Sequence, residues 1–239
     1  MSFDPPSTPP DRPLGEPVDF QPVPLPSREE LRGRYVVLRP LDADRDAQSL
    51  YAVSHPPDGD PGIWTYLFEG PYAGLDDMRR DLSEQQRSED PRFFTLAPLP
   101  EERPCGIASY LRMVPDHGVI EIGHIWFGTP MQRTTAATEA IYLLAAHAFD
   151  DLGYRRLEWK CNALNAASRR AADRFGFTFE GVFREHMVVK GRNRDTAWYA
   201  IIDRDWPPIQ ESFQRWLDPG NFDADGRQRA SLSQLRLRP

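Results

Sequence analysis

One stretch constrains this chain more than any other: a strand that passes through a short turn into a long helix. Residues 120–127 alternate as a strand, Gly128-Thr129-Pro130-Met131 follows, and the spacing predicts an amphipathic helix over 134–152 that ends at Gly153. A helix start presents free backbone N–H groups and a positive dipole end to an anion. We therefore expect an anion site at 132–138, where Arg133 adds charge, with plain capping and packing as the alternative.

The rest of the chain between residues 33 and 218 predicts one α+β domain without internal repeats. The central strands, 93–96, 106–113 and 119–127, are joined by turn residues and predict an antiparallel meander. The other expected elements are strands over 35–38 and 156–161, helices over 42–54, 74–88, 165–175 and 207–217, and a hairpin of 179–189 with 196–202 around a tip at 190–195.

The two ends of the chain differ in composition from this domain. Nine of the 24 prolines fall within residues 5–26, among several acidic residues, so we expect a Pro-rich flexible or surface-draped arm over 1–32. Pro219-Gly220 breaks the chain at the other end, and a polar, basic tail follows over 219–239. The predicted domain therefore covers 33–218.

Charge and composition exclude several functions. The 33–218 segment carries a net charge of −6, taking −3 and +2 for the two ends from the total of −7, which disfavours nucleic acid as a partner. No apolar stretch approaches the roughly 20 residues of a membrane helix. Cys105 and Cys161 are too few for a disulfide framework, and the five histidines lack metal-ligand spacing, so we expect a cytoplasmic protein without a metal.

Two motifs carry a resemblance to a known family. They are Gln132-Arg133-Thr134-Thr135-Ala136-Ala137, continued by Thr138-Glu139-Ala140, and Asn165-Ala166-Ala167-Ser168 with the closing Phe175-Gly176-Phe177. Together with the order of elements over about 33–217, they resemble the GNAT N-acetyltransferase superfamily, in its ribosomal-protein-alanine acetyltransferase-like branch. The chain departs from the family pattern at Thr135, where glycine is usual, and at Ala172, where many relatives carry a tyrosine that protonates the leaving thiolate.

The resemblance implies a mixed, mostly antiparallel sheet, splayed between 119–127 and 156–161 so that acetyl-CoA enters as co-substrate. By the same likeness, the pyrophosphate binds Gln132, Arg133, Thr134, Thr135, Ala136, Ala137 and Thr138. Asn165 and Ser168 would bind or brace the pantetheine arm, with a simple helix cap as the alternative for Asn165. Trp126 and Phe127 would contribute backbone groups at the thioester, and their side chains would pack in the core.

Glu121 stands where many relatives hold the general base. Only about one amine molecule in 10³ is uncharged at pH 7, so a base must take the proton from the ammonium form before the amine can attack. A buried carboxylate with a raised pKa can do so. The alternative is that Glu121 pairs with an arginine of the hairpin. His124 is a second candidate base, although alternation puts it on the opposite strand face.

The expected reaction is transfer of acetyl from acetyl-CoA to a primary amine by direct attack. The acceptor is expected to be a small molecule, with a protein N-terminal amine or a non-catalytic acyl-CoA-binding module as alternatives. The residues of the 190–195 tip are expected only to form the turn. The alternative is that they contact an acidic acceptor or the 3′-phosphate of CoA. Pairing with a second copy of the chain stays open.

Overall fold

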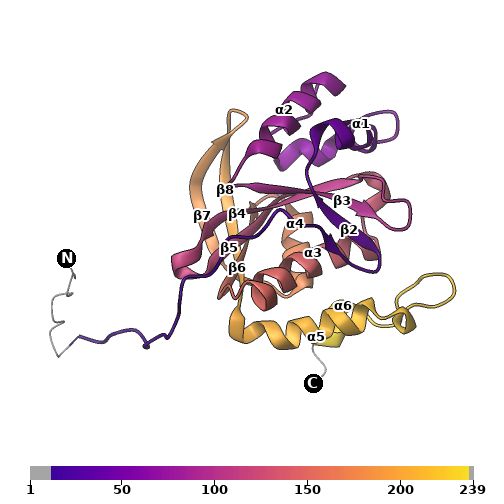
Figure 1. Cartoon of the computed structure of the whole chain (residues 1–239). Coiled ribbons are helices and arrows are strands. Elements are labelled where there is room, and N and C mark those ends of the chain that lie inside the picture. Colours follow the sequence, from indigo (N-terminus) through magenta and orange to yellow (C-terminus); the bar gives the residue numbers. More distant parts are fainter. Residues whose placement is uncertain (1–11, 237–239) are drawn as a thin grey trace.

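A single mixed sheet of eight strands, in the order β1-β2-β3-β4-β5-β6-β8-β7, organises the chain (Figure 1). A computed structural model describes residues 12–236. The strands are β1 (Leu31–Arg32), β2 (Val36–Pro40), β3 (Arg92–Pro98), β4 (Gly106–Val114), β5 (Val119–Phe127), β6 (Arg156–Asn162), β7 (Thr178–Val189) and β8 (Arg192–Ile202). The predicted α+β class is confirmed.

Helices cover both faces of the sheet. They are α1 (Ala43–Ser54), α2 (Leu75–Arg87), α3 (Thr135–Ala146), α4 (Ala166–Phe175), α5 (Trp206–Leu217) and the short α6 (Leu232–Arg236). In Figure 1, α1 and α2 lie above the sheet and α3 and α5 below it. The helix predicted over 134–152 is α3 continued by a π-helical turn, His147–Asp151. No helix within residues 12–236 has the length and apolar character to cross a membrane.

Strand pairing creates the opening on which the site depends. β2, β3, β4 and β5 pair antiparallel in sequence order, which confirms the meander. β5 and β6 are parallel, but their register covers only Val119–Glu121 against Arg156–Glu158. β6 continues to pair with β8 along its whole length. β5 and β6 therefore diverge beyond Glu121, as the predicted splay requires.

Glu139 fixes α3 to the start of β2. Its carboxylate accepts hydrogen bonds from the backbone N–H groups of Arg34 (2.9 Å), Tyr35 (2.6 Å) and Val36 (3.0 Å). A Cβ at Gly33 would lie 2.3 Å from this carboxylate, so the position tolerates no side chain unless Glu139 moves. The helix that begins at the expected anion site is thus tied to the far edge of the sheet.

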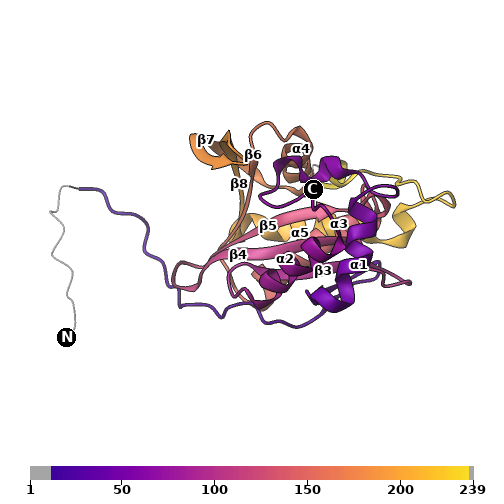
Figure 2. The same ribbon diagram turned by 90° about the horizontal axis from the view of Figure 1, so that it is seen from above.

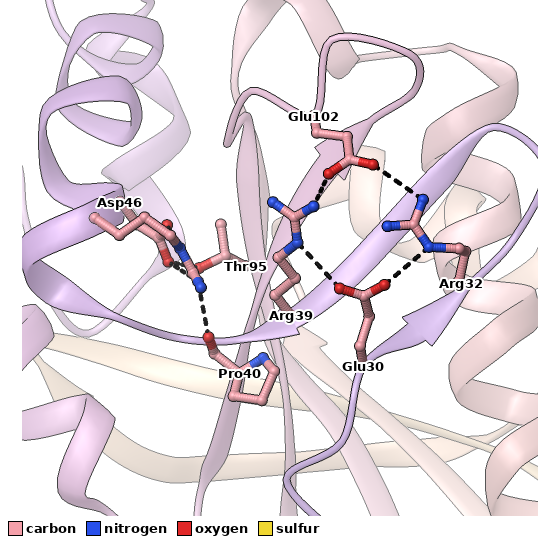
Figure 3. Close-up of polar contacts among 8 residues, drawn as sticks. Glu30, Arg32, Arg39, Pro40, Asp46, Thr95 and Glu102 are labelled. Atoms are coloured by element: carbon pink, nitrogen blue, oxygen red, sulfur yellow. Dashed lines mark hydrogen bonds and ion pairs between the residues drawn. The ribbon is translucent and has the colours of Figure 1, made fainter.

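The segment before the domain is an extended chain that begins away from the body of the protein and then runs along it (Figure 2). Val23 N–H donates to the Pro115 carbonyl at 3.3 Å, and Arg92 donates to the Pro26 carbonyl. β1, which the sequence did not predict, pairs with β2. Figure 3 shows the ion pairs beside it, in which Glu30 and Glu102 each contact both Arg32 and Arg39.

The tail also has structure. α6 buries Leu232 and Leu235, and Trp216 of α5 donates its indole N–H to Gln228 at 2.7 Å. The Arg236 guanidinium donates to the carbonyls of Asp173 and Arg174 at the end of α4. The rest of the predicted arm and tail, 1–11 and 237–239, lies outside the described residues, and the boundaries 33–218 stay a prediction.

Candidate active site

A cavity of about 110 Å³ lies where β5 and β6 diverge. β5 contributes residues 121–125 to its wall, β6 contributes 159–162, and α4 contributes Asn165 and Ser168. Residues of β4, β7 and β8 complete the wall, together with the 63–68 segment between α1 and α2. Seven separate parts of the chain thus meet at the opening in the sheet.

Glu121 lies on this wall and is only 5% exposed. Its carboxylate is 2.9 Å from Lys160 Nζ and 3.3 Å from Arg112 Nε. Lys160 also contacts Glu158 at 2.6 Å and lies 3.9 Å from the centre of the Trp198 ring. Burial raises the pKa of Glu121 above its usual value, although Lys160 and Arg112 oppose the rise. Glu121 thus pairs with an arginine, as the alternative expects, but Arg112 belongs to β4 and not to the hairpin of β7 and β8, and Lys160 of β6 is a second partner.

A β-bulge changes the placement of His124. Ile107 pairs with Trp126 and Ser109 with Gly123, so three residues of β4 face four of β5. His124 has a φ of 48°, in the left-handed region. The expectation that it faces away from Glu121 is wrong, because the extra residue shifts the alternation and both side chains line the cavity. Its Nδ1 is 3.7 Å from the Glu69 carboxylate.

The start of α3 presents unpaired donors. Thr134 is the N-cap, and its hydroxyl oxygen accepts from the Ala137 N–H at 3.2 Å. The backbone N–H groups of Arg133, Thr135 and Ala136 donate to no acceptor within residues 12–236. Arg133 has a φ of 61°, which marks a sharp turn immediately before the helix. This arrangement suits an anion such as a pyrophosphate.

The other residues expected at this helix start have structural contacts. Gln132 donates its side-chain amide to the Phe127 carbonyl at 3.0 Å, which closes the turn. Thr138 is buried, and its hydroxyl accepts from Arg174 at 3.1 Å. Thr135 is the first residue of α3 and replaces the usual glycine without a positive φ. The turn therefore obtains its left-handed residue at Arg133 instead.

The second predicted motif lies on the cavity wall. Asn165 caps α4 by accepting a hydrogen bond from the Ser168 N–H at 3.0 Å, which is the helix-cap role given above as its alternative. Ser168 Oγ accepts from the Trp159 indole at 3.0 Å. Ala172 is fully buried on the same helix. A proton donor cannot come from that position.

Trp126 and Phe127 contribute differently. The Trp126 side chain is buried against Trp64, with ring centres 5.1 Å apart. Its carbonyl oxygen lies against β4, since a Cβ at Gly106 would come within 2.6 Å of it. The carbonyl of Trp126 and the N–H of Phe127 belong to one trans peptide group and point in opposite directions, so the Phe127 N–H faces away from β4, toward the opening. Of the two, Phe127 has the better-placed backbone.

The loop between α1 and α2 that covers the cavity is held in place by the tip of the β7–β8 hairpin. Lys190 Nζ donates to the carbonyls of Trp64 (2.9 Å), Glu69 (2.8 Å) and Gly70 (2.6 Å). The tip is shorter than the 190–195 predicted, because Val189 pairs directly with Arg192 and only Lys190 and Gly191 form the turn. Arg194, expected in that tip, instead belongs to β8 and lines the cavity.

Sequence reasoning missed Lys160 and Arg194 as cavity residues. A signal for Lys160 exists: Glu158 and Lys160 alternate with Leu157, Trp159 and Cys161 in a strand that is apolar on its other face. Such charged residues in a central strand indicate a buried polar site. The described residues contain no group of three or more His, Cys, Asp or Glu placed to hold a metal ion.

Comparison with known proteins agrees with this geometry. The family model for the acetyltransferase (GNAT) domain matches residues 36–178. A GCN5-related N-acetyltransferase structure from Brucella melitensis is 44% identical with a TM-score of 0.88, covering 91% of this chain and 98% of that one. A probable acetyltransferase of the GNAT family from Chromobacterium violaceum is 38% identical with a TM-score of 0.75, over 83% and 99%.

A curated relative, "Putative ribosomal N-acetyltransferase YdaF" of Bacillus subtilis, is 26% identical over 172 residues, 71% of this chain and 91% of its own length. The family model alone covers more than half of the chain and includes β5, β6 and α4, which form the splay and part of the cavity wall, whereas β8 lies beyond the matched residues. The resemblance noted in the sequence is confirmed: this chain belongs to the GNAT family and is an acyltransferase.

Proposed function

We propose that this enzyme transfers an acetyl group from acetyl-CoA to a primary amine while both substrates are bound. The observation that carries the proposal is the buried Glu121 at the point where β5 and β6 separate, on the wall of a cavity. The pyrophosphate would bind at residues 133–137, and the unpaired N–H groups of Arg133, Thr135 and Ala136 support this site. Asn165 and Ser168 would flank the pantetheine arm.

Glu121 is the proposed base. A carboxylate with a raised pKa takes a proton from an ammonium group more readily than an ordinary one, directly or through a water. The free amine then attacks the thioester carbon, and the C–S bond breaks as the tetrahedral oxyanion collapses. The Phe127 N–H is the proposed donor to that oxyanion.

Direct transfer needs no enzyme nucleophile. Both cysteines are buried, and burial raises the pKa of each thiol, which disfavours the thiolate that covalent catalysis needs. The departing thiolate must gain a proton from elsewhere than Ala172. The proposed sources are Ser168, which lies one turn earlier on α4 and on the cavity wall, water, or a residue from another part of the wall.

Two classes of acceptor fit an amine site of this kind. The small cavity under a loop fastened by Lys190 favours a small-molecule amine. The name of the Bacillus subtilis relative favours a protein N-terminus as the second candidate. A panel that contains both small amines and short peptides with free N-termini separates them.

The test combines binding and turnover. Saturating acetyl-CoA should raise the melting temperature, and Ala137→Asp should abolish that shift by placing negative charge at the helix start. Glu121→Gln should lower kcat/KM by about 10²–10⁴ at neutral pH and leave acetyl-CoA affinity unchanged. Glu211→Gln, at an exposed position of α5, is the control.

The results can refute each part separately. If acetyl-CoA gives neither a thermal shift nor calorimetric heat, the acetyl-CoA proposal is wrong. Binding without release of free thiol across the whole panel would instead support a non-catalytic acyl-CoA-binding module. Normal turnover by Glu121→Gln would leave Glu121 as a structural residue, and His124 would be the next base to test.

A further inference from the structure

Arg194 is a buried cation without an anionic partner. Its side chain belongs to β8, is 7% exposed and lines the cavity. Among residues 12–236 its guanidinium forms no ion pair, and its Nε is a buried donor with no acceptor. A buried charge is costly unless it is paired, so such a group points to an anion that is absent from the chain itself.

The nearby carboxylates are engaged elsewhere. Glu121 is held by Lys160 and Arg112, and Glu158 by Lys160 and Arg156. The adjacent Asp195 accepts hydrogen bonds from the Glu185 N–H and the Asn193 amide. None of these carboxylates forms an ion pair with Arg194, although Glu121 acts on it at longer range.

The geometry around Arg194 is fixed. The guanidinium carbon lies 4.7 Å from the centre of the Phe68 ring, in the loop that Lys190 fastens. Stacking on a ring sets the plane of the guanidinium, and a planar fork of donors matches a carboxylate. The loop that covers the cavity therefore also helps to hold the Arg194 side chain in place.

The position of Arg194 indicates which substrate carries the anion. The pyrophosphate site proposed above begins at Arg133, and no residue of 132–138 lines the cavity that contains Arg194. Glu121, the proposed base for the amine, lines the same cavity. The part of acetyl-CoA proposed to lie in this cavity, beside Asn165 and Ser168, is the uncharged pantetheine arm. The anion should therefore belong to the amine acceptor and not to acetyl-CoA.

We propose that Arg194 selects acceptors that carry a carboxylate in addition to the amine. This inference rests on the proposed function, since it names the class of acceptor for the same site. The carboxylate can come from a small amino acid or from an acidic side chain next to a peptide N-terminus, and the bond to Arg194 is the same in both.

The experiment uses two matched pairs of acceptors with acetyl-CoA and the full-length enzyme. One pair is 4-aminobutanoate and 4-aminobutanamide, and the other is Ala-Asp-Ala-amide and Ala-Asn-Ala-amide. For wild type, kcat/KM should be about 10- to 100-fold higher for the carboxylate member of one pair, since a bond between ionised groups is lost in the amide. The pair that discriminates identifies the source of the carboxylate.

Variants assign the preference to one side chain. Arg194→Met should reduce the preference to within about twofold while acetyl-CoA binding stays unchanged, and Arg194→Lys should keep part of it. Arg192→Gln, an exposed position of the same strand, should behave as wild type. Arg194→Met should also melt at a higher temperature than wild type without acceptor, because it removes an unpaired buried charge.

The outcomes separate this inference from the proposed function. Turnover of the amides at the rate of the carboxylates, in wild type and variants alike, would overturn the inference and leave the acetyltransferase intact. If no amine is acetylated, the proposed function fails, and the inference is judged by binding. A thermal shift with 4-aminobutanoate or with Ala-Asp-Ala-amide that Arg194→Met abolishes would support it, and the absence of a shift with both would refute it.

Discussion

Replacing Glu139 with glutamine tests how α3 is fixed to the sheet. The carboxylate accepts three backbone N–H groups from residues 34–36, two of them on one oxygen. Glutamine can keep two of these bonds as neutral ones and must turn its NH₂ toward the third donor. A bond to a charged group contributes about 1.5–3 kcal/mol and a neutral one about 0.5–1.5 kcal/mol, so replacing three charged bonds by two neutral ones should cost about 3.5–6 kcal/mol.

Urea unfolding followed by circular dichroism and tryptophan fluorescence measures this loss. The midpoint should fall while the slope of free energy against urea stays constant, because the surface exposed on unfolding does not change. Glu211→Gln, on the exposed face of α5, should stay within about 0.5 kcal/mol of wild type. A Glu139→Gln protein as stable as that control would show that the three bonds contribute little, and the reasoning would be refuted.

Two further predictions concern the site and the tail. The pKa of Glu121 is raised, and only the ionised carboxylate can accept a proton, so kcat/KM should fall as the pH drops through that raised pKa. Glu121→Gln should abolish this fall at acidic pH. The same fall in the variant would refute the assignment of Glu121 as the base. Truncation after Asp218 removes the buried Leu232 and Leu235 and should cost about 3–6 kcal/mol, read as a lower melting temperature, whereas unaltered melting would show that α6 does not stabilise the domain.

Local patterns were enough to predict the elements that carry the site. The strand, turn and capped helix around Gly128 depend on neighbours in the chain, and the structure reproduces them as β5 and α3. The antiparallel meander follows from short turns between β3, β4 and β5. These features need no knowledge of which distant segments meet.

The missed features depend on distant pairing. The partners of Glu121 come from β4 and β6, and only the sheet order sets them beside β5. The sequence pattern places Arg194 in a turn because strand register in a hairpin depends on the length of the tip, and the predicted tip is four residues longer than the observed one. His124 was misplaced by a single bulge residue that alternation cannot anticipate.

The hydrogen bonds from Lys190 to the loop that covers the cavity have a consequence for chemical labelling. The chain has two lysines, Lys160 and Lys190, and each ammonium group is engaged in the folded protein. Lys160 is buried between two carboxylates, so reagents that couple to lysine amines would react with Lys190 first. Coupling there would convert three donated hydrogen bonds into one at most, and would loosen the loop that carries Phe68. Immobilisation or dye attachment through lysine would therefore alter the acceptor side of the enzyme, and an engineered surface cysteine is the better handle.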